Sequence, residues 1–361
     1  MISKKSKNKP KKNNSRFFLS KLQKTEDKVK DAISSAPRIT NETVSDHREE
    51  VLGRARKYIY PLKHSRHHIV RISVGLLIAV IIGFFIYMGL ELYDFQSTSG
   101  FVYTTSDVIP FPVAKAGKSW ISYHSYLFEL RRNIHYYETQ QQADFSSQSG
   151  KAQLTSLKQQ AMKQVIEDAY VKQLAAKYNI TVTSNDINQE VSLLKQQNKL
   201  GNSTQVFDNV LREYWGWNEG DFKAELGQQL LQQKVVAKLD TQTNQTAQSI
   251  EEQLAKGTPF ATLAATSSDD TSTKASGGQY SQVISPQSTA VAPQIVNGLF
   301  KLNVGQVSPI INTGYSLEIV KPISISGTSI TAAHIQINYR PITVFTNPLR
   351  QQNPPKIYIK T

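Results

Sequence analysis

The sequence contains no cysteine. Disulfide bonds, thiol catalysis and zinc–thiolate sites are therefore excluded, and the chain is compatible with any redox compartment. The sequence also lacks a glycine-rich phosphate loop and a Gly-x-Ser-x-Gly elbow, and the expected helices between about 123 and 240 carry no histidine pair at metal-binding spacing. A hydrolase or nucleotide-dependent enzyme is therefore not indicated, and we expect no metal site and no cofactor.

Apolar residues make up only 39% of the 361 positions, which is low for one compact globule, and the length predicts two or three domains. The formal charge of +14 is concentrated at the N-terminus. Residues 1–71 carry 19 Lys and Arg against 7 Asp and Glu, a net of +12, so the other 290 residues carry only +2. We expect residues 1–71 to be a basic arm, largely disordered, that can contact anionic lipid. No aromatic interleaving accompanies the lysines, so no specific nucleic acid is expected as a partner.

One long apolar run follows this arm. Ile72–Leu90, ISVGLLIAVIIGFFIYMGL, has 19 residues without a formal charge, and as a helix it spans roughly 28 Å, about the thickness of bilayer hydrocarbon. Basic residues precede the run, whereas Glu91 and Asp94 follow it. The positive-inside rule then predicts a single-pass membrane protein with a transmembrane helix at 72–92, a cytoplasmic N-terminus and an extracytoplasmic body.

The first part of the body has helical periodicity. Two short extended pieces surround Gly117, a helix is expected from Tyr123 to Tyr137, and apolar stripes at three- and four-residue steps predict further helices up to about residue 240. The passages VAKAG-KSWIS, QAMKQVIEDAYVKQLAAKYNITVTSNDINQEV and FDNVLREYWGWNEGDFKAELGQQLLQQKVV resemble, in this order, the N-terminal domain of SurA/PrsA-type extracytoplasmic chaperones. The resemblance implies a helical chaperone domain at 105–240.

The second part, 241–361, carries an ordered set of motifs: G-x-x-F-x-x-L-A at 257–264, S-D-D at 268–270, G-G at 277–278, the run from Pro293 to Ser308, and G-Y at 314–315. In this order the motifs are similar to the parvulin family of peptidyl-prolyl isomerases. Parvulins begin with a strand that carries a histidine, and no such strand precedes residue 246. TAAHIQI (331–337) alternates like a strand and comes last. The resemblance therefore implies a circularly permuted domain in which 331–337 pairs with the strand at 314–323 through a turn at Gly327.

The expected fold class is α+β: a single transmembrane helix, a helical SurA-N-like domain, and a small parvulin-like domain with helices around a four-stranded antiparallel sheet. The tail 338–361 contains two β-prone pieces, TVF and KIYIK, which either add an edge strand or stay extended.

The resemblance also implies a site. Its catalytic positions are His334, Asp270 and Ser316, the last standing where the family has a second histidine. Its substrate-binding positions are Tyr280, Ala290, Ile295 and Phe300. Because the second histidine and two bulky pocket residues are replaced, two functions stay open. The first is a parvulin-type peptidyl-prolyl cis-trans isomerase and chaperone for exported proteins. The second is a catalytically inactive holdase that only binds unfolded or proline-containing segments. In both cases the partners are unfolded, newly exported polypeptides, together with the lipid bilayer around 72–92.

Overall fold

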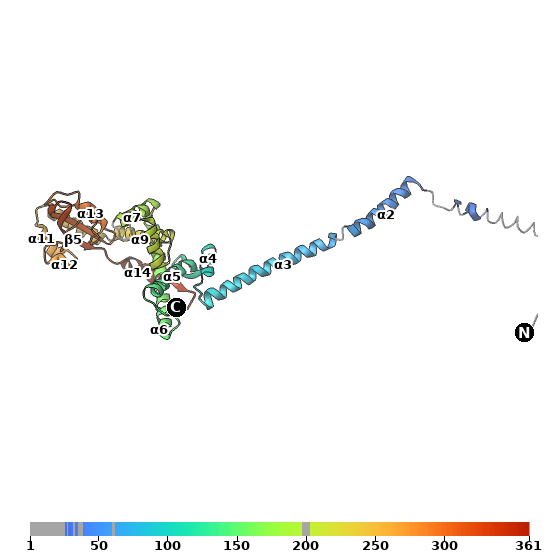
Figure 1. Ribbon diagram of the computed structural model, residues 1–361, viewed down its shortest axis with the longest axis horizontal. Coiled ribbons are helices and arrows are strands. Elements are labelled where there is room, and N and C mark those ends of the chain that lie inside the picture. The colour runs from blue at the N-terminus through green and yellow to red at the C-terminus, as the bar shows by residue number, and fades with distance from the viewer. Residues whose placement is uncertain are drawn as a thin grey trace, which may run out of the picture. The chain divides into compact units, whose positions relative to one another are not determined.

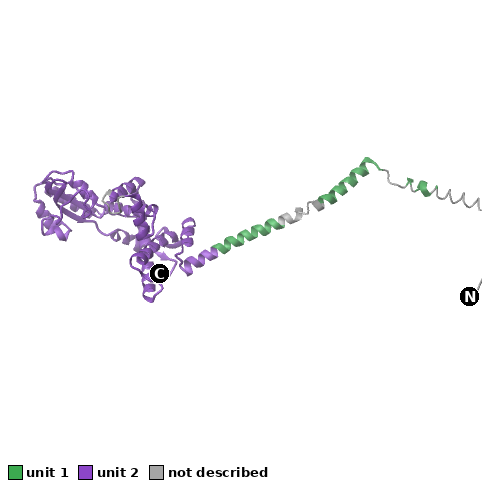
Figure 2. Ribbon diagram, in the orientation of Figure 1, with its two compact units in different colours: residues 1–84 green, residues 85–361 purple. Residues whose placement is uncertain are grey.

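The computed structural model describes residues 26, 28–31, 33, 34, 39–59, 62–196 and 203–360. The chain divides into two compact units, residues 1–84 and 85–361 (Figure 2). Of residues 1–71, which the sequence predicts to be largely disordered, 33 lie outside the described residues, most of them among the first 38, whereas 41–59 and 62–71 are helical. In the first unit, α2 runs from Asn41 to Ile59 and carries mostly exposed side chains.

The apolar run forms one long helix. α3 (Leu62–Gly89) continues into a π-helical turn, η1 (Leu90–Asp94). The segment His68–Asp94 contains an 18-residue window with a mean hydropathy of 2.7, and it is long and apolar enough to cross a membrane. Between Ile72 and Leu90 this segment has no charged side chain on any side, which is the composition expected of a helix in lipid. The predicted segment 72–92 lies inside these limits.

The helical part of the second unit contains the predicted hairpin and helices, together with one helix that was not predicted, Gly100–Val108 (Figure 1). Its helices and strands are α4 (Gly100–Val108), β1 (Pro112–Ala116), β2 (Ser119–Ser122), α5 (Tyr123–Gln140), α6 (Gln148–Lys177), α7 (Ser184–Gln196), α8 (Thr204–Trp215) and α9 (Glu219–Leu239). The two extended pieces around Gly117 are confirmed as a β-hairpin, and Gly117 adopts φ +55°, a turn conformation that favours glycine. Sequence-local signals set the helix ends: Asn218 and Asp221 form a capping box at the start of α9, and Gly216 ends α8 in the left-handed region.

The following part combines four short helices with a sheet. The elements are α10 (Thr241–Ala255), α11 (Phe260–Ser267), α12 (Thr271–Lys274), α13 (Pro293–Leu299), β3 (Ile311–Asn312), β4 (Ser316–Ser326) and β5 (Ser329–Asn338). Within the described residues the sheet has three strands in the order β3-β4-β5, all antiparallel. The place of the expected fourth strand is taken by segment 279–284, which joins β5 through two isolated bridges.

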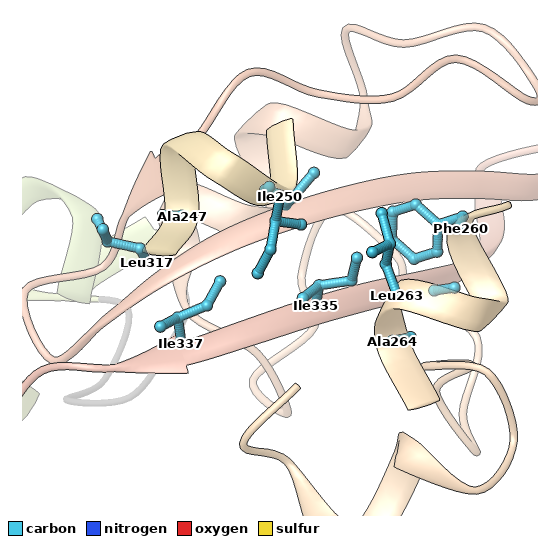
Figure 3. Close-up of a cluster of buried hydrophobic side chains, with 10 residues drawn as sticks. Ala247, Ile250, Phe260, Leu263, Ala264, Leu317, Ile335 and Ile337 are labelled. Atoms are coloured by element: carbon cyan, nitrogen blue, oxygen red, sulfur yellow. The ribbon is translucent and has the colours of Figure 1, made fainter. Parts of the chain in front are cut away.

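β4 and β5 form the hairpin that the sequence predicts. Leu317 pairs with Ile337, Ile319 with Ile335 and Lys321 with Ala333, and Gly327 turns the chain at φ +57°. The predicted pairing of 331–337 with 314–323 is therefore confirmed. One face of the hairpin packs against α10 and α11, and Figure 3 shows side chains of both helices over those of the strands: Ala247, Ile250, Phe260, Leu263, Ala264, Leu317, Ile335 and Ile337. The opposite face of the hairpin carries a second apolar cluster, which includes Val320, Ile330 and Ala332, and beside it the polar side chain of His334.

The tail returns to the helical part. α14 (Thr343–Gln352) contacts α6 through the Arg350–Glu167 ion pair, and Tyr170 Oη donates to the Asn353 carbonyl over 2.7 Å. β6 (Lys356–Ile357) then pairs antiparallel with β1. The KIYIK piece thus adds an edge strand, whereas the expectation of β-structure for TVF is wrong. The division at residue 240 remains a prediction, but residues 343–357 pack with the preceding domain rather than with 241–338.

Candidate active site

His334 lies on the face of β5 that is turned away from α10 and α11. It stands opposite Val320 in the β4–β5 register, so Glu318, two residues earlier on β4, is its diagonal neighbour on the same face. The imidazole is almost fully buried, at 3% exposure. Its Nδ1 lies 2.9 Å from Glu318 Oε2, and its Nε2 lies 2.9 Å from Asp270 Oδ2. Each ring nitrogen therefore faces a carboxylate.

The S-D-D motif is attached to the edge of β5 that does not pair with β4. Ser268 Oγ accepts from the Gln336 amide at 3.1 Å, and the Asp269 carboxylate accepts from the Asn338 amide at 2.8 Å. The Asp269 amide in turn donates to the Gln336 carbonyl over 2.7 Å. These bonds leave Asp270 at the start of α12, with its side chain directed at His334.

Asp270 is held by several donors at once. Ser272 Oγ donates to Oδ1 and Thr273 Oγ1 donates to Oδ2, both over 2.6 Å, and the Ser272 amide also donates to Oδ1. Burial alone would raise the pKa of Asp270, but the hydrogen bonds from Ser272, Thr273 and His334 outweigh it and hold this pKa well below its usual range. Asp270 is thus a carboxylate at every physiological pH.

The protonation of His334 follows from its two partners. Burial alone would lower the pKa of the imidazole, but the hydrogen bonds and charges of Glu318 and Asp270 raise it above 6.5. The charged form, which can donate from both ring nitrogens, is the form that this geometry favours.

Tyr280 covers the histidine ring. The two rings are stacked with centroids 4.2 Å apart and planes 23° apart. Segment 279–284 is held beside β5 because the Tyr280 amide donates to the Ala332 carbonyl and the His334 amide donates to the Gly278 carbonyl. Gly278 is required at that point: it adopts φ +85°, and a Cβ there would lie 2.2 Å from the His334 carbonyl oxygen. The phenol of Tyr280 stays neutral, since burial and the nearby Glu318 and Asp270 charges raise its pKa.

These side chains line a cavity of about 420 Å³. Its polar wall includes Asp270, Thr273, Ser316, Glu318 and His334, and its apolar wall includes Ile284, Ala290, Val291 and Ile295. The structure thus brings together six of the seven sequence-predicted positions: His334, Asp270, Ser316, Tyr280, Ala290 and Ile295. Phe300 is not with them. Leu299, its neighbour at the end of α13, points into the core and is fully buried, whereas Phe300 is 39% exposed outside the cavity.

Sequence reasoning missed Glu318. Its side chain is 2% exposed, accepts from Ser316 Oγ over 2.9 Å and faces His334. A carboxylate inside an apolar strand, two positions after Ser316 and so on the same face, was the available signal. Its partner could not be known before the β4–β5 register was.

Comparisons with known proteins cover most of the body. Residues 62–236 match the family described as SurA-like N-terminal domain, and residues 230–324 match the PPIC-type PPIase domain. The foldase protein PrsA of Caldanaerobacter subterraneus subsp. tengcongensis is 27% identical over 191 residues. That alignment covers 48% of this chain and 58% of the relative, so the chain spans less than two thirds of the length of the curated relative it matches.

Two solved structures are also similar. The peptidylprolyl isomerase PrsA from Bacillus anthracis is 21% identical, with 53% of this chain and 86% of that chain covered and a TM-score of 0.18. The foldase protein PrsA from Streptococcus pneumoniae is 17% identical, with 65% and 84% covered and a TM-score of 0.20. TM-scores this low do not establish a shared arrangement of the whole chain.

Proposed function

We propose that this chain is a SurA/PrsA-type chaperone that catalyses prolyl cis-trans isomerisation in exported polypeptides, because residues 62–236 match the SurA-like N-terminal domain and residues 230–324 match the PPIC-type PPIase domain. In this proposal the apolar helix anchors the protein in the membrane, with the basic N-terminal arm in the cytoplasm and residues after about 93 outside. The clients are unfolded, newly exported chains. The lysines of the arm contact anionic lipid headgroups.

The observation that carries this proposal is the placement of His334 between two carboxylates on the wall of a half-apolar cavity. Isomerisation of an X–Pro bond crosses a barrier of about 18–20 kcal/mol, because the planar amide must lose its conjugation as it twists. A site accelerates this step if it binds the twisted amide more tightly than the planar one. The apolar wall around Ile295 fits a pyrrolidine ring and removes water from it.

The polar wall then acts on the amide itself. In the planar amide the carbonyl oxygen carries more negative charge than in the twisted amide, because conjugation transfers electron density from nitrogen to oxygen. The Asp270 carboxylate, which is 20% exposed toward the cavity, disfavours that negative oxygen and so favours the twisted form. His334 is the positioning residue. It keeps Asp270 in place by a hydrogen bond, and its positive charge balances part of the negative charge of Asp270 and Glu318.

We also propose that β5 is the first strand of the parvulin domain, moved to its end. The PPIC-type match stops at residue 324, before β5 begins, yet β5 pairs along its whole length with β4 and presents His334 to Asp270. The last and first strands of the unpermuted domain would be neighbours in the same way. A hairpin turn at Gly327 is sufficient to join them.

The test is a protease-coupled assay of a prolyl peptide with the full-length protein in detergent micelles. We expect His334→Ala to lower kcat/KM by roughly ten-fold or more, since it removes the side chain that keeps Asp270 in position beside the twisted amide. His135→Ala is the matched control, because His135 lies in the helical part and its imidazole is hydrogen-bonded only to the Glu213 carbonyl within the described residues. Equal activity of both variants would contradict a catalytic site at His334.

A second candidate, the inactive holdase, is favoured by one observation. Ser316 stands where the family has its second histidine, and Ala290 leaves the apolar wall with little bulk. A holdase would suppress aggregation of an unfolded client without accelerating isomerisation, and His334→Ala would leave that suppression unchanged. The same protein preparation in the two assays separates the candidates.

A further inference from the structure

Exposed apolar side chains occur at the end of the apolar run and on the residues that follow it. Leu90, Phe95, Phe101 and Val108 are 45%, 71%, 56% and 78% exposed. We call these four residues the apolar collar. Phe101 and Val108 lie seven positions apart on one face of α4, with the exposed Thr104 between them, so they form a single stripe along the helix.

The collar belongs to a well-anchored part of the body. Met88 and Leu92 are fully buried, the Tyr123 hydroxyl donates to the Leu92 carbonyl, and the Tyr93 hydroxyl donates to the Pro112 carbonyl over 2.7 Å. Exposure of the collar is therefore a fixed feature of the fold and not the result of a loose loop.

α4 is anchored as well. Val102 is fully buried, the Ser99 hydroxyl caps the helix by accepting from the Val102 amide, and Tyr103 stacks on His124 at 4.6 Å. With its opposite side packed in this way, α4 presents the Phe101–Val108 stripe outward. Asp107 is the one charged residue of the helix.

Helix length places this region at the level of the lipid. Bilayer hydrocarbon is about 30 Å thick and requires about 20 apolar residues. Charge-free residues begin at Ile72, directly after Arg71, and the first compact unit ends at Phe84. A span that ended there would have 13 residues and cover only about 20 Å. The span must continue to about Leu90. Residues 85–90 are therefore both part of the span and part of the body's fold.

The body surface beside those residues must then reach the bilayer. The Phe101 ring lies 6.3 Å from the ring of Tyr87, which is inside the span. We propose that the apolar collar is a lipid-contacting surface that seats the body on the outer face of the membrane. This inference rests on the membrane anchoring proposed above. The occupant is lipid and not a second copy of the chain, because the collar is continuous with a helix whose own apolar surface requires lipid.

Single-cysteine labelling tests the proposal, since the chain has no cysteine of its own and each introduced thiol is therefore labelled at one known position. Phe101→Cys and Val108→Cys report on the collar. Val80→Cys reports on the span, and Thr328→Cys, exposed at the β4–β5 turn, is the aqueous control. Each full-length variant carries an environment-sensitive fluorophore and is reconstituted in phosphatidylcholine–phosphatidylglycerol vesicles with or without acyl-chain-brominated lipid. Thr104→Cys gives a second probe of the stripe if loss of the Phe101 or Val108 side chain disturbs folding.

We expect bromolipid to quench the labels at 101 and 108 roughly two-fold or more, because interfacial helices lie about 5–10 Å into the headgroup–acyl boundary. The label at 328 should be unaffected. Quenching at 80 with none at 101 and 108 would overturn the collar and leave the anchor standing. Absence of quenching at 80 would overturn both. Blue-shifted emission at 101 and 108 without quenching would show that protein, such as a second copy, covers the stripe, which also overturns the proposal.

Discussion

The most direct prediction concerns Glu318, the buried carboxylate that faces His334. In Glu318→Gln the side-chain shape and the hydrogen bond with Ser316 are kept, but the negative charge 2.9 Å from Nδ1 is removed. A hydrogen bond to a charged partner contributes about 1.5–3 kcal/mol and a neutral one about 0.5–1.5 kcal/mol, so the variant should lose about 1–2 kcal/mol of unfolding free energy. At about 2–4 °C per kcal/mol for a chain of this size, the loss is measurable as a lower Tm.

The loss should depend on pH. The pKa of His334 is raised in the folded protein, so the stabilisation from its charged form is fully present below the unfolded value of 6.5 and is lost as the pH rises through the folded pKa. We therefore expect a larger difference between wild type and variant at pH 6 than at pH 9. In an NMR titration, Glu318→Gln should also lower the pKa of His334, whose resonance is assigned by its absence in His334→Gln.

Glu252→Gln is the control for charge removal as such. Glu252 is exposed on α10, so its neutralisation should change stability by less than about 0.5 kcal/mol. An unchanged His334 titration in Glu318→Gln, or a stability loss equal at pH 6 and pH 9, would refute the charged pair.

Three further predictions follow from the same structure. Ile295→Ala should lower kcat/KM for a prolyl peptide roughly ten-fold, because it removes apolar contact inside the cavity. Phe300→Ala, outside the cavity, should change kcat/KM by less than about two-fold. Equal effects of the two variants in the peptide assay would contradict substrate binding in this cavity. Arg340→Ala should destabilise the body by about 1–3 kcal/mol in a denaturant titration, since it removes the 2.8 Å bond from Nε to the fully buried Asp240 carboxylate; an unchanged midpoint would contradict this. Burial raises the pKa of Glu129 to about 8, so the free energy of unfolding should fall as the pH rises between about 4.5 and 8, by up to about 1.4 kcal/mol per pH unit. Glu129→Gln should flatten this pH profile. A profile that keeps its slope in the variant would show that another group is responsible.

Much of the fold could be predicted from local sequence. Helix stripes, the capping box at Asn218 and the turns at Gly117 and Gly327 depend on residues within a few positions of one another, so their signals are visible in the chain itself. The TVF piece shows the limit of such signals. Its β-branched residues favour a strand in isolation, but in α14 the contacts with α6 outweigh that preference.

The residues of the candidate site that belong to family motifs could be predicted from the sequence. His334 and Asp270 carry recognisable patterns, and the structure places them 2.9 Å apart. Phe300 was predicted by its spacing from Pro293, but a helix turns each residue by about 100°, so the neighbour of the buried Leu299 faces outward. Glu318 has no motif, and its role depends on which residue of β5 stands across from it.

The sequence by itself determined the apolar span, the succession of helices and strands, and the strand that carries His334, because these follow from the period and composition of short segments. Only the tertiary structure decided that two carboxylates meet one imidazole, that the tail returns to α6 and β1, and that the end of the span is built into the body. The physical reason is that hydrogen bonds and packing act between atoms a few ångströms apart, whereas these partners are separated by 16 to more than 200 residues along the chain.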